Sequence, residues 1–436
     1  MVRALEVEIL ARETIKPSSP TPHNLRNFKL SLLDQIMPVE YTAAILFYSN
    51  NGHHADGAEM SQRLKAALPE TLKNFYPFAG IIKDNVLVEC NDNGAVFVEA
   101  RANYPLSEVL QQHDHKLLRE FLPIEIESTK AGSGPLLLTQ VTIFKCGGVA
   151  VGNCLSHKIA DGCAASFLAK SWAATVLDPG NKAKVNTPEY VIAASLFPPD
   201  DSLEPHADVT GQNYITKRFV FHASKIAQLK AKVTSASVPK PTRVEAIVAL
   251  IWKSTITASR SIRGFPRVSL TAHSMNLRRM VSPPLPDNCV GNFVGDFPAK
   301  ATQREIELQD LVHQLRKGKD EFCKNGLQNI LEKKSSLMHG VEGDAVDFYM
   351  YSDLSRLPMY DTDFGLGKPV WVTIPNYMHN MIMLLSTRNG EGIEALVSLS
   401  EEDMALFERD EELLAFADPN PSVLPVANHS TRKFAA

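Results

Sequence analysis

The segment at residues 156–162, Ser-His-Lys-Ile-Ala-Asp-Gly, places a histidine and an aspartate on one short loop. An expected strand precedes this loop and an expected helix follows it, and loops held by such elements often carry reactive groups. His157 could act as a general base toward a substrate hydroxyl, because the unperturbed pKa of histidine lies near physiological pH. Asp161 could orient the loop or pair with a distant basic residue. The alternative is a buried structural histidine beside a helix-capping carboxylate.

The sequence offers no pattern for an enzyme nucleophile. It has no Gly-x-Ser-x-Gly elbow that would expose a reactive serine, and none of its six cysteines stands out as an activated thiol. Direct attack by a bound alcohol, with His157 as the base, therefore fits better than a covalent enzyme intermediate.

A second segment, Asp363-Phe-Gly-Leu-Gly367, has glycines that could line a phosphate. Its spacing matches neither the Walker loop nor Gly-x-Gly-x-x-Gly, and it precedes an expected strand, so no helix N-terminus would face the phosphate. A tight structural turn that uses Gly365 and Gly367 is the favoured interpretation. The Asp-Phe-Gly triplet also occurs in protein kinases, but no His-Arg-Asp loop accompanies it.

The start of one expected helix carries a capping-box pattern, Thr242-Arg-Val-Glu245. Lys240, Arg243 and Lys253 lie around this helix and could meet a phosphate, although a solvated helix start is the simpler interpretation of these charges.

Histidine pairs at His53-His54 and His113-x-His115 could in principle bind a metal ion. Both pairs lie in polar loops and lack cysteine or carboxylate ligands at metal-site spacing. We interpret them as surface histidines and expect no metal site.

The elements that must position these residues alternate between strands and helices along the whole chain. Apolar runs of strand length occur at Leu5–Ile9, Ala43–Tyr48, Leu136–Phe144, Val149–Leu155, Lys217–His222, Arg267–Met275, Val370–Thr373 and Met381–Leu385. Helical patterns occur at Ser61–Thr71, Ala164–Val176, Ala223–Ala236, Thr242–Thr255, Glu307–Cys323 and Glu402–Ala417. A turn at 91–94 predicts a hairpin of Val86–Cys90 with Ala95–Ala100. The mixture indicates an α/β (mixed α+β) class.

The chain length of 436 residues predicts more than one domain, since single cores stop growing near ~250–300 residues. Residues 179–212 are rich in Pro, Asp, Asn and Lys without sustained periodicity, as is typical of a linker. We therefore expect an N-terminal domain at 1–178 with the His157 loop, a crossover linker at 179–212, and a C-terminal domain at 213–436 with the glycine segment.

Composition excludes several classes of protein. With 44% hydrophobic residues and a net charge of −4, the chain is neither disordered nor suited to broad electrostatic binding of nucleic acid or anionic membranes. The cysteines show no C-x-x-C spacing, which favours a reduced compartment. Without a signal-peptide pattern or an apolar run of ~18 residues, we expect a cytosolic protein outside the membrane.

Together, His157-Lys-Ile-Ala-Asp161-Gly162 and Asp363-Phe-Gly-Leu-Gly367 resemble the HxxxDG and DFGWG motifs of the plant BAHD acyltransferases, in the same order. The resemblance covers almost the whole chain and is closest to the branch with vinorine synthase, salutaridinol acetyltransferase and deacetylvindoline acetyltransferase. Further matching stretches are Pro17-Ser-Ser-Pro-Thr-Pro22, Leu30-Ser-x-Leu-Asp34, Phe75-Tyr-Pro-Phe-Ala-Gly80, Cys146-Gly-Gly148, Asn276-Leu-Arg278 and Val290-Gly-Asn292.

The resemblance implies a fold and a central site. Such enzymes have two similarly sized domains of the CoA-dependent acyltransferase type, each a mixed sheet with helices, and a solvent channel between them. Acyl-CoA enters the channel from one face and the alcohol from the other. His157 would be the general base, and Asp161 would point away from the substrate and pair with Arg278 to keep the loop in shape.

The resemblance also implies roles outside the central loop. Asp363, Gly365 and Gly367 would form a structural motif, remote from the reacting atoms and near the CoA side. The helix that begins at Thr242 and Arg243 would lie in the CoA-facing half. We take these two residues and Lys368 as the candidate CoA contacts.

Two departures from the family pattern bear on the identity of the acceptor alcohol. Leu366 stands where the family has tryptophan, and Ser352-Asp-Leu-Ser-Arg356 replaces a common Ser-Trp-Cys-Arg stretch. The resemblance implies a monomeric enzyme that uses acetyl-CoA as co-substrate, without a bound cofactor, to acetylate a hydroxyl of an alkaloid or terpenoid. The alternatives are N-acylation of an amine and a catalytically silent small-molecule-binding or scaffold protein of the same fold.

Overall fold

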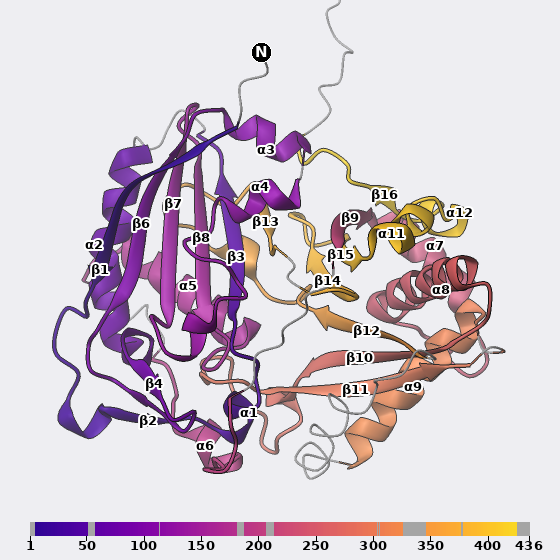
Figure 1. Ribbon diagram of the computed structural model, residues 1–436, viewed down its shortest axis with the longest axis horizontal. Helices are drawn as coiled ribbons and strands as arrows, with labels where there is room; N and C mark the ends of the chain where they lie inside the picture. The colour runs from indigo at the N-terminus through magenta and orange to yellow at the C-terminus, as the bar shows by residue number, and fades with distance from the viewer. Residues whose placement is uncertain are drawn as a thin grey trace, which may run out of the picture.

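Two mixed β-sheets, one built mainly from each half of the chain, stand side by side in the computed structural model (Figure 1). The structure describes residues 5–50, 57–112, 114–180, 187–205, 213–302, 304, 306–325, 346–375 and 378–424. This arrangement confirms the expected mixed α/β class with two sheet-based halves.

The first sheet has six strands in the order β1-β6-β7-β8-β3-β13. Their bounds are β1 Val7–Ile15, β3 Tyr41–Tyr48, β6 Ala95–Ala102, β7 Leu137–Phe144, β8 Val149–Ser156 and β13 Trp371–Thr373. A small sheet of order β2-β5-β4 lies below it in Figure 1 and consists of β2 Asn27–Lys29, β4 Ile81–Lys83 and β5 Leu87–Glu89.

The second sheet has seven strands in the order β11-β10-β12-β14-β15-β9-β16. Their bounds are β9 Ile215–Phe221, β10 Val268–Asn276, β11 Val294–Ala301, β12 Val346–Asp353, β14 Met381–Ser386, β15 Ile393–Leu399 and β16 Asp418–Pro419.

Helices bury the faces of both sheets. The described helices are α1 Leu32–Gln35, α2 Gly57–Asn74, α3 Leu106–Gln112, α4 His115–Arg119, α5 Gly162–Leu177, α6 Ile192–Leu196, α7 Ala223–Val233, α8 Arg243–Arg263, α9 Leu308–Asn325, α11 Glu401–Phe407 and α12 Glu411–Leu414. Side chains of α2 and α5 share one core with the first sheet, and those of α7, α8, α9 and α11 share another with the second.

Strand β8 holds the start of the His157 loop in place, and it is rigid because both of its faces are buried. Val151 and Leu155 belong to the core under α2 and α5, and Ala150 and Cys154 belong to the core on the other face. Every residue of the strand is buried, as expected for a nearly continuous apolar run between two covered faces. The chain therefore leaves a rigid strand at the point where His157 begins the loop.

The two helix starts that matter for the site are capped by their own side chains. The Asp161 carboxylate accepts a hydrogen bond from the backbone N–H of Ala164 at 2.9 Å and so begins α5. The capping box of Thr242 and Glu245 begins α8, as the sequence pattern predicted. Gly264 ends α8 in the left-handed conformation that glycine adopts without steric cost.

One strand crosses between the halves of the chain. Strand β13 pairs antiparallel with β3, and the ring of Trp371 stacks on that of Phe47 at 5.4 Å. A strand from the second half thus forms the edge of the first sheet. The domain boundaries at 178 and 213 remain a prediction.

The expected hairpin of 86–90 with 95–100 is wrong. Strand β5 pairs with β2 and β4, whereas β6 pairs with β1 and β7 in the large sheet. The Asp92 carboxylate between them accepts hydrogen bonds from the N–H and hydroxyl of Thr21 at 3.0 and 2.6 Å. That contact holds the turn against the segment of Thr21, and the strands on either side of the turn lie in different sheets.

The ends of several predicted elements also shift. The first strand extends to Ile15, beyond the predicted end at Ile9. The predicted helix at 402–417 is two short helices, α11 and α12, because Asp410 caps a new helix start by accepting the N–H of Leu413 at 2.9 Å.

Candidate active site

A cavity of about 1640 Å³ lies between the two sheets and holds the His157 loop on its wall. The first half contributes residues of β3, β8 and α5, and the second half contributes the start of α8 and residues of β10, β12 and β14. Both halves therefore build one site.

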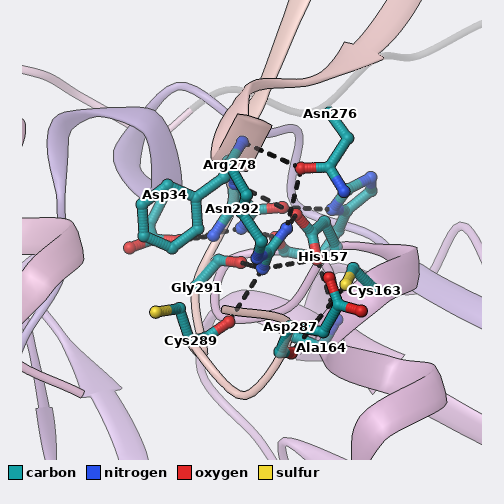
Figure 2. A network of polar contacts seen from close by, with 12 residues as sticks. Asp34, His157, Cys163, Ala164, Asn276, Arg278, Asp287, Cys289, Gly291 and Asn292 are labelled. Carbon is teal, nitrogen blue, oxygen red and sulfur yellow. Dashed lines mark hydrogen bonds and ion pairs between the residues drawn. The ribbon is translucent and has the colours of Figure 1, made fainter. Parts of the chain in front are cut away.

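Asn292 fixes the orientation and the tautomer of His157 (Figure 2). The amide Nδ2 of Asn292 donates to the His157 carbonyl oxygen at 2.7 Å and to Asp34 Oδ1 at 2.8 Å. Because both partners can only accept, the Asn292 Oδ1 must face the imidazole, where it lies 3.1 Å from Nδ1. His157 therefore carries its proton on Nδ1, and Nε2 is the hydrogen-bond acceptor that a general base requires.

Asp34 anchors Asn292 from a fully buried position. Its carboxylate accepts hydrogen bonds from the N–H and hydroxyl of Ser31 at 2.8 and 2.6 Å and from the backbone N–H of Asn292 at 2.7 Å. Burial raises the pKa of Asp34, although these hydrogen bonds act in the opposite direction. The site thus extends inward from His157 through Asn292 to Asp34.

Asp34 and Asn292 were not assigned a role from the sequence, although both lie in stretches that match the family. The Ser31-x-x-Asp34 spacing is a helix-start signal and could have placed Asp34 at a capping box, which the structure contains. No local pattern could have placed Asn292, because its partners are distant in the chain.

The structure brings Asp161 and Arg278 together in a buried, bidentate ion pair. The Arg278 Nη1 lies 2.6 Å from Asp161 Oδ2, and Nη2 lies 3.1 Å from Oδ1. The two side chains are 0% and 3% exposed. Burial lowers the pKa of Arg278, but the adjacent carboxylate outweighs it and leaves that pKa above its ordinary value.

This ion pair ties the His157 loop to the segment that holds Asn292. Arg278 Nη2 donates to the carbonyl oxygens of Cys289 and Gly291 at 2.8 and 3.2 Å, and Asp161 Oδ2 accepts the N–H of Phe293 at 3.0 Å. Asp161 is therefore suited to position His157 through Asn292.

Lys158, next to the candidate base, is a fully buried lysine. Its ammonium donates to the backbone carbonyls of Gln35 and Met37 at 2.6 and 2.9 Å. Burial lowers the pKa of Lys158 to about 8, against the opposing effect of Asp34. Because Met37 lines the cavity, Lys158 fastens part of the cavity wall to the His157 loop.

The glycine segment forms a turn away from the cavity wall. Asp363 Oδ1 accepts the N–H groups of Gly365 and Gly367 at 2.7 and 2.9 Å, and both glycines have positive φ. Phe364 and Leu366 are buried in the core with α5. None of these residues lines the cavity, which supports the structural interpretation of the segment.

The three candidate CoA contacts have different surroundings. Thr242 lines the cavity while its hydroxyl caps α8. Arg243 donates to the Gly390 carbonyl at 3.2 Å, and Lys368 pairs with Asp361 at 2.8 Å with its side chain 62% exposed. Arg243 and Lys368 lie outside the cavity wall, so the structure brings only Thr242 to it.

The histidine pairs lie partly outside the described part of the chain. His53, His54 and His113 lie outside the described residues, and His115 is half-buried at the start of α4. Among the residues that the structure describes, no group of three or more His, Cys, Asp or Glu side chains could hold a metal ion. In the same part of the chain, no helix has the length and apolar character needed to cross a bilayer.

Sequence comparison identifies the family of this chain. The model of the Transferase family matches residues 5–414. The BAHD acyltransferase BIA1 of Arabidopsis thaliana is 38% identical, with 96% of this chain and 99% of that protein aligned. The chain belongs to the BAHD acyltransferase family. This BAHD acyltransferase is also 36% identical to limonoid 7-O-acetyltransferase of Citrus sinensis (96% and 100% covered) and 34% identical to stemmadenine O-acetyltransferase of Catharanthus roseus (93% and 97% covered).

Solved structures confirm the BAHD fold. The crystal structure of vinorine synthase superposes with a TM-score of 0.87 at 33% identity, covering 96% of this chain and 100% of that one. A Fusarium graminearum TRI101 structure, complexed with coenzyme A and T-2 mycotoxin, shares the fold with a TM-score of 0.71 at 17% identity, covering 90% and 99%. This BAHD acyltransferase therefore has the two-sheet fold of enzymes that bind coenzyme A.

Proposed function

We propose that this enzyme transfers acetyl from acetyl-CoA to a hydroxyl of an alkaloid or terpenoid alcohol, with His157 as the general base. The observation that carries the proposal is the Nδ1 contact with Asn292, which leaves Nε2 as an acceptor on a side chain that lines the cavity.

The reaction needs only one titrating side chain. The acceptor hydroxyl donates to His157 Nε2 and, as it loses its proton, its oxygen attacks the thioester carbonyl of acetyl-CoA. The Asn292 Oδ1 continues to accept from Nδ1–H, which holds the imidazolium in place. When the tetrahedral intermediate collapses, the C–S bond breaks, and the proton on Nε2 passes to the departing CoA sulfur. The products are the acetate ester and free CoA.

The cavity wall supports a bulky acceptor. Eight of the 12 methionines line it, namely Met37, Met275, Met280, Met350, Met359, Met378, Met381 and Met383. Methionine side chains are flexible and fill irregular gaps, so such a wall suits a rigid, apolar ring system. The names of the limonoid and stemmadenine acetyltransferases point to acceptors of this kind.

The two departures from the family motifs differ in their consequences for the acceptor. Leu366 is buried in the core away from the wall, so its change repacks the turn without altering the cavity surface. Asp353, Leu354 and Arg356, in contrast, line the cavity. We propose that these residues, rather than Leu366, distinguish the acceptor of this enzyme from those of its relatives.

A release assay for CoA tests the proposal. Purified enzyme, acetyl-CoA and a panel of polycyclic alcohols and amines are combined, and free thiol and product masses are followed. His157→Ala should lower turnover ~10²–10⁴-fold, the usual contribution of a general base. His222→Ala is the matched control, because His222 is 57% exposed and pairs with Asp418 outside the cavity.

The assay also separates the alternatives. Products from amines alone would show N-acylation. Binding of acetyl-CoA without turnover on any member of the panel would indicate a catalytically silent binding protein. Near-full turnover in His157→Ala would show that another group is the base.

A further inference from the structure

We infer that Asn153 forms a second polar contact for the acceptor, one that binds an oxygen other than the hydroxyl being acylated. The inference rests on the proposed function and concerns how the acceptor is oriented. It assigns a ligand contact to the middle of β8, away from the His157 loop.

Only the oxygen of the Asn153 amide has a hydrogen-bond partner among the described residues. Its Oδ1 accepts a hydrogen bond from the Thr139 hydroxyl at 2.6 Å. Its Nδ2 group has no hydrogen-bond acceptor among the residues that the structure describes. Asn153 is 7% exposed, and it lines the cavity. Two N–H donors therefore stand at the wall of a site from which bulk water would be excluded on substrate binding.

The residue opposite Asn153 on the neighbouring strand is small and apolar. On β3 the residue opposite it is Ala44, which also lines the cavity and is small enough to leave the amide accessible. Ala44 packs against an apolar cluster that includes Met381 and Met383 of the second sheet. A polar amide beside Ala44 in a mostly apolar wall is the kind of group that orients a ligand.

Ser166 supplies an independent observation on the helix that covers this face of the sheet. It lies one turn into α5, is 8% exposed and lines the same cavity. Its buried hydroxyl has no hydrogen-bond partner among the described residues. The unpaired hydroxyl of Ser166 indicates that a ligand completes its hydrogen bonds, because burying such a group unpaired is unfavourable, and Asn153 lines the same cavity.

The separation from His157 indicates which molecule makes the contact. Asn153 precedes His157 by four residues on an extended strand, which corresponds to roughly 13 Å at ~3.3 Å per residue. The acetyl group itself is far too short to span this distance, which leaves the acceptor and the pantetheine arm of CoA. Thr242 and Glu245, which line the expected CoA side, come from the second half of the chain, whereas Asn153 and Ser166 come from the first. We therefore assign the contact to the acceptor.

The donor chemistry specifies the acceptor class. Nδ2 can only donate, so its partner is a lone-pair acceptor, such as a carbonyl, ester, ether or hydroxyl oxygen, and not an ammonium group. The acceptor is thus an extended polycyclic alcohol that carries a second oxygen function at the end opposite the acylated hydroxyl.

Steady-state kinetics of two Asn153 variants test this assignment, with the alcohol of highest kcat/KM in the panel as the probe. Asn153→Asp keeps the size of the side chain but replaces both N–H donors by oxygen, and Asn153→Ala removes the amide. We expect KM for the alcohol to rise roughly tenfold, the effect of losing one hydrogen bond, with KM for acetyl-CoA within about twofold of the wild type. Thr142→Val is the matched control, because it removes a buried hydroxyl of β7 whose hydrogen-bond partner is Gln140 and which does not line the cavity.

A substrate-based version does not depend on the folding of the variants. An analogue of the probe alcohol without its second oxygen should bind the wild type roughly tenfold more weakly, and Asn153→Ala should then cause no further loss.

Three results would contradict the inference. These are an unchanged KM for the alcohol in both variants, a rise in KM for acetyl-CoA instead, and equal binding of the analogue. Absence of turnover of any alcohol by the wild type would refute the proposed function itself, and this inference with it.

Discussion

Removing the negative charge of Asp161 should destabilise the protein by leaving Arg278 buried without its counter-ion. In Asp161→Asn the new amide can still cap α5, since asparagine is as good an N-cap as aspartate. The guanidinium, which is 0% exposed, loses both contacts to a carboxylate. Breaking a buried ion pair on one side costs about 3–5 kcal/mol.

Thermal unfolding converts this cost into a measurable shift. With an unfolding entropy of about 2.1 cal/mol/K per residue, a 436-residue chain that unfolds as one unit loses about 1 °C of Tm per kcal/mol. We expect Asp161→Asn to lower Tm by about 3–5 °C. The double variant Asp161→Asn/Arg278→Met should recover part of the loss, because neither charge then remains buried.

The control for this experiment is Asp418→Asn, which removes the carboxylate that contacts His222; both side chains are more than half exposed. Its Tm should stay close to that of the wild type, because exposed ion pairs contribute little. An unchanged Tm in Asp161→Asn, or a double variant less stable than the single one, would refute this account of the ion pair. Loss of turnover at unchanged Tm would instead show that Asp161 acts on the reaction without stabilising the fold.

Three further predictions concern the surroundings of His157 and the glycine turn. Asn292→Ala should lower kcat by at least about tenfold with KM for acetyl-CoA unchanged, because Nδ1–H loses its acceptor; an unaltered kcat would show that the tautomer is set elsewhere. Burial lowers the pKa of Lys158 to about 8, so between about pH 8 and 10.5 the unfolded chain holds a proton on Lys158 that the folded chain has lost. The free energy of unfolding therefore rises with pH over this range. Lys158→Met should remove at most about 1.4 kcal/mol per pH unit of that rise, as measured by urea unfolding, and equal slopes would contradict the burial argument. Gly365→Ala should cost about 1–2 kcal/mol because φ is 92°, with turnover unchanged; a loss of turnover would place the turn in the reaction.

Local signals predicted the elements that carry the site. The apolar run of β8, the cap at Asp161 and the capping box at Thr242 each depend on residues close in sequence, and each is present in the structure. The motif resemblance also paired Asp161 with Arg278 across the two halves.

Features that depend on distant partners were beyond the reach of local patterns. The role of Asn292 follows from contacts with Asp34 and His157, and the pairing of β13 with β3 joins segments far apart in the chain. The strands β11, β12 and β15 were missed as well. Val346–Asp353 in β12 mixes two tyrosines with two aspartates and a serine, and it is a strand because neighbours on both sides pair with it.

Strand β13 has a consequence for any attempt to divide this enzyme. A fragment that ends at the crossover segment would lack Trp371–Thr373, so the edge of β3 from Ile45 to Phe47 would have no hydrogen-bonding partner. An exposed, apolar strand edge pairs readily with other chains. The first half made alone should therefore aggregate, and co-expression of two halves should restore a soluble enzyme only if the second fragment inserts its strand into the first.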